Sequence, residues 1–215
     1  MHIETLLLTF LPSLLILAIV IASDKFPEPP KLVFAIFFLG FLLCLPAGEL
    51  NYYFIDGRGS EDALTFIAGI TEESLKFLAF FLFVWDRVEF DEPMDAIVYG
   101  TCISLGFATF ENYEYVYFYN EDLTPFSVAL IRSMSAVPLH ACCGIIMGHY
   151  LGCFKFSGDR RLLFASLAIP IFVHSVYNFL TDYGLLWAIF LTGVIGFTFR
   201  QFKNARRRQR LQSQS

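Results

Sequence analysis

The sequence has little charge and no stretch of polar residues long enough to form a separate soluble domain. Only 16% of its 215 residues are Asp, Glu, Lys or Arg, whereas 56% are hydrophobic and 26 are Phe. The mean hydropathy of +0.59 is far above that of an ordinary soluble protein. These values exclude a soluble globular protein and predict one that lies mostly within a lipid bilayer.

Two short motifs of cysteine and histidine are also absent. The five cysteines contain no Cys-x-x-Cys pair, so neither a disulfide framework nor a zinc ribbon is predicted. No His-Glu-x-x-His motif occurs, so no local spacing requires a metal ion. We therefore expect no metal and no cofactor, with zinc kept as an alternative below.

Hydrophobic runs of membrane-spanning length recur along the whole chain. We expect an all-α, polytopic membrane helix bundle of about seven transmembrane helices, at residues 3–22, 32–50, 63–84, 95–118, 123–154, 162–180 and 185–202. Residues 1–202 are predicted to form one transmembrane domain and residues 203–215 a basic cytoplasmic tail. The first run has no Lys or Arg before it and no small-x-small cleavage site after it, so it is expected to remain in the mature protein.

Lysine and arginine are distributed unequally between the two ends of the predicted helices. One set of loops and the C-terminal tail hold nearly all of them, whereas the opposite loops hold only Arg58. Because cytoplasmic loops are enriched in Lys and Arg, we predict the N-terminus outside and the C-terminus in the cytoplasm. The arginine-rich tail is expected to contact anionic lipid of the bilayer, and no nucleic-acid partner is predicted.

The third hydrophobic run contains three charged residues in its middle, Glu72, Glu73 and Lys76. Glu72 and Lys76 are spaced i,i+4, and Glu73 and Lys76 are spaced i,i+3, so the lysine can reach both carboxylates. One ammonium cannot neutralise two carboxylates, so we expect either a proton shared by the pair or a raised pKa of one carboxyl group. Charges are costly at this depth, which favours a functional site over a purely structural ion pair.

Three other predicted helices carry ionisable or amide side chains within apolar surroundings. The fourth has a row of small residues that leads to Glu111 and Asn112, which could instead belong to the outer interfacial cap. The fifth contains His140, two residues after a proline, and the sixth has His174 and Asn178 on neighbouring turns of one face. We expect these groups to converge on the glutamate pair.

Peptide hydrolysis needs a base for the water, donors for the oxyanion and an acid for the leaving amine. Glu72 or Glu73 could hold the water with a histidine, while His174 and Asn178 stabilise the oxyanion and Lys76 keeps one carboxylate ionised. A zinc-dependent version would use His140, His174 and one glutamate as ligands. A proton-coupled transporter or a non-catalytic scaffold would also contain intramembrane carboxylates and histidines.

Four ordered segments resemble the motifs of the PrsW family of intramembrane proteases. The segment Glu72-Glu73-Ser74-Leu75-Lys76 resembles the EExxK motif of that family, and the segment from Gly106 to Asn112 is similar to its GFAxxEN motif. The segment from Pro138 to Gly152 is similar to its PxHAxxG…GxYLG motif, and the segment from His174 to Phe179 resembles its final HxxYx(F) motif. The resemblance covers the third to sixth predicted helices. The first, second and last contribute little to it.

This resemblance implies a peptidase of the glutamic type, distantly related to the CAAX-processing proteases, in a bacterial or archaeal plasma membrane. Its substrate would be a single-pass membrane protein, such as an anti-sigma factor, cleaved near the outer face. Carried over by position, Glu72, Glu73 and His174 are the strongest catalytic candidates, and His140 is a fourth. Glu111, Asn112, Asn178 and Lys76 have supporting roles.

One position departs from the pattern of the CAAX-processing relatives. Their second motif supplies a histidine where this sequence has Glu111. The pairing that activates water is therefore open, and His140 is the residue that could provide the missing imidazole.

Overall fold

The computed structural model describes residues 2–55, 64–119 and 122–212. Within these ranges the chain is helical and contains eight helices: α1 Ile3–Ser23, α2 Pro30–Phe54, α4 Phe66–Phe83, α5 Pro93–Tyr117, α6 Pro125–Met134, α7 Ala136–Ser157, α8 Arg160–Thr181 and α9 Leu186–Gln212. The all-α fold class is thus confirmed. Arg58, on which the charge count for the outer loops depends, lies outside the described residues.

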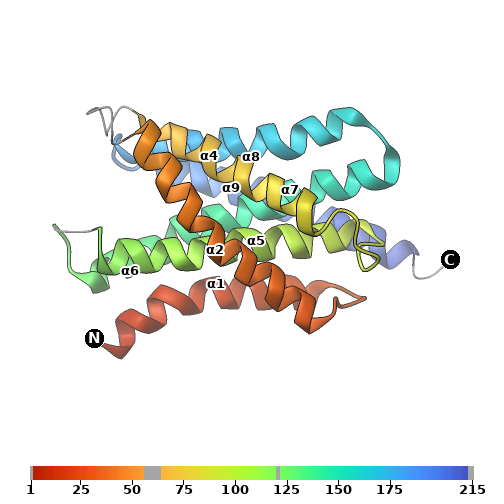
Figure 1. Ribbon diagram of the computed structural model, residues 1–215, viewed down its shortest axis with the longest axis horizontal. Helices are drawn as coiled ribbons and strands as arrows, with labels where there is room; N and C mark the ends of the chain where they lie inside the picture. Colours follow the sequence, from red (N-terminus) through yellow and green to blue (C-terminus); the bar gives the residue numbers. More distant parts are fainter. Residues whose placement is uncertain (1, 56–63, 120–121, 213–215) are drawn as a thin grey trace.

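The helices run roughly along one axis, and the two ends of the chain lie at opposite ends of the molecule (Figure 1). This placement agrees with an odd number of membrane crossings. Among the described residues, four helical stretches are long and apolar enough to cross a membrane by length and composition: α1, α2, Pro125–Ser157 and Arg160–Leu180. The side of the membrane on which each terminus lies stays a prediction.

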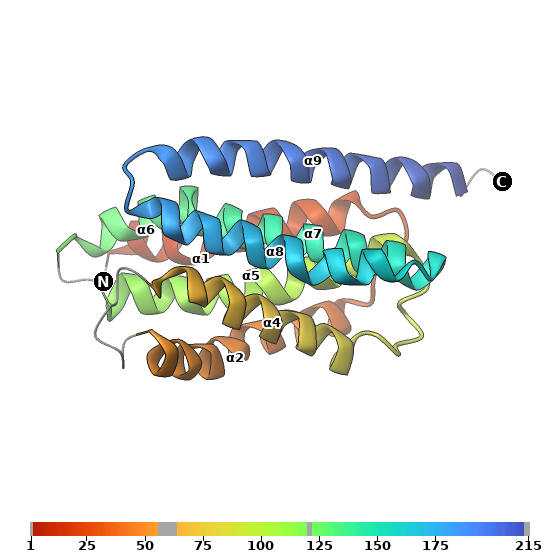
Figure 2. The ribbon, with the colours of Figure 1, turned by 90° about the horizontal axis from the view of Figure 1, so that it is seen from above.

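Helix α5 forms the centre of the bundle and is buried over most of its length. It packs against α1, α2 and α7, while α4 packs against α2 and α8 (Figure 2). The close approach of α7 to α5 depends on Gly148, because a Cβ there would overlap the backbone of Ala96. The predicted rows of small residues therefore allow these two helices to pack backbone against backbone.

The fifth predicted span differs from the expected single helix. It is divided at Ser135 into α6 and α7, and Ser135 has φ −126° and ψ −76°. Pro138 explains the position of the break, because its ring clashes with the carbonyl group four residues earlier, at Met134, and it has no N–H to donate. The break brings Pro138 into the first turn of α7, where proline is well tolerated.

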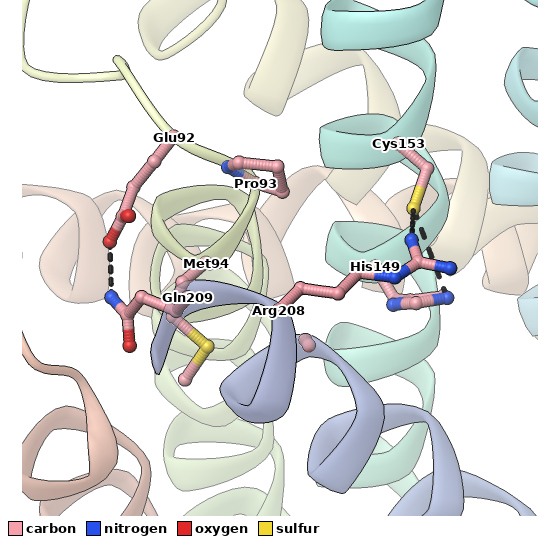
Figure 3. Close-up of a pocket in the computed structure, with 8 residues that line it drawn as sticks. Glu92, Pro93, Met94, His149, Cys153, Arg208 and Gln209 are labelled. Atoms are coloured by element: carbon pink, nitrogen blue, oxygen red, sulfur yellow. Dashed lines mark hydrogen bonds between the residues drawn. The ribbon is translucent and has the colours of Figure 1, made fainter. Parts of the chain in front are cut away.

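The last helix extends further than predicted. It continues through the basic segment to Gln212, so the arginines expected in a separate tail belong to the final turns of α9. Gln209 donates hydrogen bonds to Asp24 and to Glu92 at the start of α5, and Figure 3 shows the bond to Glu92. These bonds hold the end of α9 against the same end of the bundle at which α5 begins.

Candidate active site

The polar residues predicted from four different helices meet at one place in the bundle. Helix α4 supplies Glu72, Glu73 and Lys76, and α5 supplies Glu111. His140 comes from α7, and His174 comes from α8. The rings of the two histidines lie 4.9 Å apart, in an edge-to-face arrangement. The convergence expected from the sequence is therefore present in the structure.

Glu73 and Lys76 form the fully buried part of this group. The Nζ atom of Lys76 lies 2.7 Å from Oε1 of Glu73 and 4.1 Å from the centre of the Phe107 ring. The same Glu73 oxygen lies 3.0 Å from Nδ1 of His174. Both Glu73 and Lys76 are 0% exposed. Glu73 therefore orients His174 through a hydrogen bond and balances the charge of Lys76 through an ion pair, inside the bundle.

His140 is fixed through both of its ring nitrogens. Its Nδ1 lies 3.0 Å from Nζ of Lys76, and its Nε2 lies 2.9 Å from Oε2 of Glu111. Because a lysine ammonium can only donate, Nδ1 accepts and the Nε2–H donates to Glu111. Arg132 Nη2 donates to the same Glu111 oxygen at 2.7 Å. Glu111 is thus part of the buried network and not merely an interfacial cap.

Glu72 and Glu73 each have one oxygen, Oε2, without a hydrogen-bond partner among the described residues, and Glu72 differs in where that oxygen lies. Its Oε2 has no hydrogen-bond partner among the described residues, although Glu72 is only 3% exposed. This oxygen lies 3.9 Å from Nε2 of His174 and 3.7 Å from Nζ of Lys76. Since Nδ1 of His174 faces the Glu73 carboxylate, the free lone pair of that histidine is at Nε2. A carboxylate oxygen that accepts no hydrogen bond from a described residue and an imidazole lone pair therefore lie 3.9 Å apart.

A cavity of about 920 Å³ gives access to this pair of atoms. It is bounded by side chains of α2, α4, α5, α7 and α8, among others, and its lining includes Glu72, Glu111, His140, His174 and Asn178. Glu73 and Lys76 are not part of this lining. Of the two adjacent glutamates, Glu72 is the one that a substrate or a water molecule in the cavity can contact.

Asn51, on α2, belongs to the site but was not predicted from the sequence. Its Nδ2 donates to Oε1 of Glu72 at 3.2 Å, and the hydroxyl of Thr71 donates to its Oδ1. Thr71 therefore fixes the amide so that its donor side faces the carboxylate. The second predicted span has no family motif and no charge in its middle, so the only available signal was an amide near the end of an apolar run.

The two asparagines that were predicted from the sequence, Asn112 and Asn178, lie in different places. Asn112 is buried behind the site, where its Nδ2 donates to the Thr9 carbonyl at 2.8 Å and its Oδ1 accepts from Nε of Arg132 at 2.9 Å. It therefore supports Arg132 and does not line the cavity. Asn178 does line the cavity, and its Nδ2 donates to the Thr65 carbonyl at 3.2 Å.

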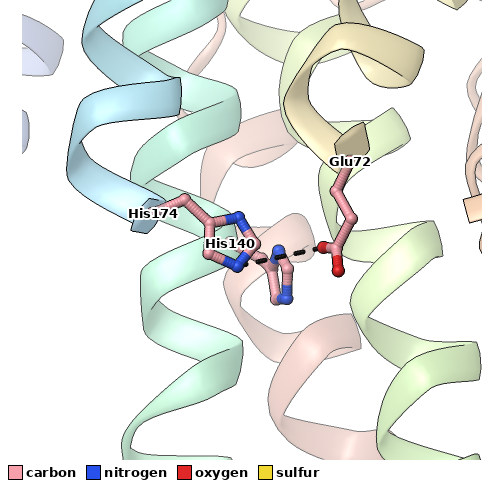
Figure 4. A group of neighbouring side chains, drawn as sticks. All are labelled: Glu72, His140 and His174. Atoms are coloured by element: carbon pink, nitrogen blue, oxygen red, sulfur yellow. Dashed lines mark ion pairs between the residues drawn. The ribbon is translucent and has the colours of Figure 1, made fainter. Parts of the chain in front are cut away.

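Glu72, His140 and His174 could also hold a metal ion. One potential ligand atom from each lies within 4.8 Å of the others, and all three residues are buried (Figure 4). Two histidines and one carboxylate are a known zinc ligand set. Each imidazole contacts a carboxylate through its other side, Glu73 for His174 and Glu111 for His140, as metal-bound histidines commonly do. His140 would first have to release one of its two nitrogen contacts.

Comparison with known proteins gives a consistent result. Residues 28–200 match the family model described as "PrsW family intramembrane metalloprotease". The chain is 33% identical over 206 residues to "Protease PrsW" of Bacillus subtilis, covering 91% of this chain and 92% of that protein. It is also 33% identical to "Protease PrsW" of Geobacillus kaustophilus, covering 91% and 89%, and 29% identical to that of Clostridioides difficile, covering 89% and 84%.

No solved structure gives a significant match. The family match extends over all four motif segments and over the helices that supply the site. It favours a peptidase over the transporter and the scaffold that the sequence alone left open. The chain is a multi-pass membrane peptidase and belongs to the PrsW family of intramembrane proteases.

Proposed function

We propose that this protein is an endopeptidase that hydrolyses a peptide bond of a single-pass membrane protein, with Glu72 as the base that activates water. The observation that carries this proposal is that Glu72 lies in the wall of the cavity, with its Oε2 3.9 Å from Nε2 of His174 and without a hydrogen-bond partner among the described residues. Oε2 of Glu73 also has no such partner, but Glu73 is not part of the cavity lining. This separation is too long for a direct hydrogen bond. It is short enough for one water molecule to contact both atoms.

The proton transfers can be assigned to these atoms. A water that donates one hydrogen to Glu72 and the other to His174 keeps a lone pair for attack on the carbonyl carbon. Glu72 takes the proton as the C–O bond forms, and later gives it to the leaving nitrogen as the C–N bond breaks. The second hydrogen of the water stays on the new carboxyl group until His174 accepts it at Nε2 and releases it to solvent, so that the products are a carboxylate, an amine and one proton. Glu73 is a positioning residue in this scheme, because it holds the imidazole of His174 with Nε2 toward the cavity.

The developing oxyanion needs hydrogen-bond donors. Asn178 has a second amide hydrogen besides the one that it donates to the Thr65 carbonyl, and it lines the same cavity. We assign this amide to the oxyanion, while His174 holds the attacking oxygen through its Nε2. A donor placed in a low-dielectric site in this way stabilises the transition state more than one exposed to water.

The substrate is assigned from the position of the cavity and from the family. With the predicted topology, the cavity lies toward the outer ends of α2 and α5, where Tyr52, Tyr115 and Tyr119 are part of its lining. Cleavage would thus occur near the outer face of a bacterial cell membrane. An anti-sigma factor with one membrane span is the substrate we propose. Its cleaved segment must be unwound, because helical carbonyl groups are already hydrogen-bonded.

A second candidate is a metal-dependent peptidase, which is favoured by the ligand geometry of Glu72, His140 and His174. A bound zinc ion would polarise the scissile carbonyl and lower the pKa of a bound water. Glu73 and Glu111 would then hold the two imidazoles in orientation. The ammonium of Lys76, 3.0 Å from Nδ1 of His140, opposes a second cation at this place. For that reason we prefer the metal-free scheme.

Chelation separates the two schemes. The purified protein would be reconstituted in liposomes with a single-span test substrate and treated with a membrane-permeable chelator of zinc. We expect the cleavage rate to change by less than about twofold, because Glu72 can accept the proton without a metal. Loss of cleavage that added zinc restores would reject the metal-free scheme and support the second candidate.

Asn51 provides a further test of the role of Glu72. We expect Asn51→Ala to lower kcat about tenfold to hundredfold, because a hydrogen bond to a charged group contributes about 1.5–3 kcal/mol. Asn51→Asp should be more severe, since it places a second carboxylate beside Glu72. Asn204→Ala, on an exposed position of α9, is the matched control and should cleave at the wild-type rate. Unchanged kcat in Asn51→Ala would show that this amide does not position Glu72.

A further inference from the structure

Helix α2 contributes a wide face to the cavity, and Gly48 lies at its centre. The cavity-lining residues of α2 are Cys44, Leu45, Ala47, Gly48, Glu49, Asn51 and Tyr52, followed by Ile55 at the end of the helix. At 3.6 residues per turn, Ala47 and Glu49 mark the two edges of this face, and the other members lie within about 60° of Gly48. A side chain at position 48 would therefore project into the cavity.

The space in front of Gly48 is open. A Cβ built on this residue meets no other atom within 4 Å. Gly40, two turns earlier on the same helix, is different, because a Cβ there would overlap the backbone of Ile103 on α5. Gly40 is therefore needed for helix packing, whereas Gly48 is not. Since glycine lowers helix stability relative to alanine, its presence at position 48 has another reason.

The surroundings of Gly48 indicate what could occupy this space. Cys44, Ala47 and Phe107 form a buried apolar cluster beside it. One turn further along α2, Asn51 contacts Glu72, whose unpaired Oε2 is buried and belongs to the same cavity. The open space is thus apolar on one side and adjoins the proposed water-activating carboxylate on the other.

We propose that Gly48 is a specificity-determining residue, whose missing side chain forms a subsite for a bulky apolar side chain next to the scissile bond of the substrate. This inference rests on the proposed function, because it takes the cavity as the place where the substrate is cleaved. A leucine or phenylalanine of the substrate would fill the space and contact Phe107 and Ala47. A lysine would bring a charge against the apolar cluster, and an alanine would leave the space empty.

The test uses the full-length protein in liposomes with a panel of single-span substrates. Mass spectrometry of the products locates the cleaved bond. Ala, Leu, Phe or Lys is then placed in turn at each of the two positions on either side of it. The enzymes compared are wild type, Gly48→Ala, Gly48→Leu and Gly193→Leu. Gly193 is the matched control, because a Cβ there also meets no other atom within 4 Å. It lies at an exposed position of α9, outside the cavity lining.

We expect wild type to prefer Leu or Phe over Ala by about tenfold or more in kcat/KM at one of these positions, as filling an apolar pocket provides. Gly48→Leu should reverse this preference at that position, Gly48→Ala should reduce it, and Gly193→Leu should leave it unchanged. All variants should have a melting temperature equal to or higher than that of wild type, because glycine lowers helix stability.

Two results would overturn the inference while leaving the proposed function in place. One is a Gly48→Leu enzyme that cleaves the panel in the wild-type order, and the other is an equal change of preference in Gly193→Leu. If Gly48→Leu does not fold, an unchanged preference in Gly48→Ala overturns it as well. A wild-type protein that cleaves no member of the panel would instead reject the proposed function, and the inference with it.

Discussion

Replacement of Glu72 by Gln should reduce kcat by about 10²- to 10⁴-fold, the usual contribution of a general base. The amide has nearly the shape of the carboxylate but cannot take a proton from water. Oε2 of Glu72 lies 3.7 Å from Nζ of Lys76, whereas Oε1 of Glu73 lies 2.7 Å from it. Because Glu72→Gln leaves this closer ion pair in place, we expect it to lower the melting temperature less than Glu73→Gln does. Cleavage of a reconstituted single-span substrate and thermal unfolding in detergent measure the two effects.

Glu73→Gln is the comparison that shows whether the effect of Glu72→Gln is specific to catalysis. Glu73→Gln removes a charge that contacts both Lys76 and His174 inside the bundle, so it should lower the melting temperature as well as the activity. Glu4→Gln, on an exposed residue of α1 outside the cavity lining, is the control and should retain both. Equal loss of stability in Glu72→Gln and Glu73→Gln would remove the distinction between the two residues. Full activity in Glu72→Gln would reject Glu72 as the base.

Much of this site could be predicted because ionisable groups in apolar helices are conspicuous. Glu72, Lys76, His140 and His174 each stand in a run of hydrophobic residues, and a charge at such a depth is expensive unless it has partners. The same reasoning predicts that such groups meet, since each needs another. The structure brings them within hydrogen-bond or ion-pair distance of one another.

Two features of the site depend on tertiary packing and could not be predicted. Glu72 and Glu73 point about 100° apart on one helix, and which of them faces the cavity depends on how α4 is rotated against α8. Asn51 lies on a helix without charges in its middle, and its contact with Glu72 depends on the crossing of α2 over α4. Helical periodicity alone predicts neither the rotation of α4 against α8 nor the crossing of α2 over α4.

Lys76→Met should have the largest effect on stability. The Nζ atom of this residue lies 2.7 Å from Glu73, 3.7 Å from Glu72 and 3.0 Å from His140, and none of its surface is exposed. Methionine has a similar volume, so packing is kept while the positive charge is lost. The glutamates then remain buried without a counter-charge, which costs about 3–5 kcal/mol in the free energy of unfolding. Thermal and denaturant unfolding in detergent should detect this loss.

A double variant shows whether the charge is the cause. In Lys76→Met/Glu73→Gln both members of the closest ion pair are neutral, so no unpaired charge remains at that position, and we expect most of the stability to return. Activity should not return, because a neutral amide at position 73 holds the imidazole of His174 less firmly than a carboxylate does. If the double variant is as unstable as Lys76→Met, then Lys76 stabilises the bundle by packing on Phe107 and not by its charge. Recovery of stability without activity would show that the Glu73–Lys76 pair holds the fold and orients His174 at the same time.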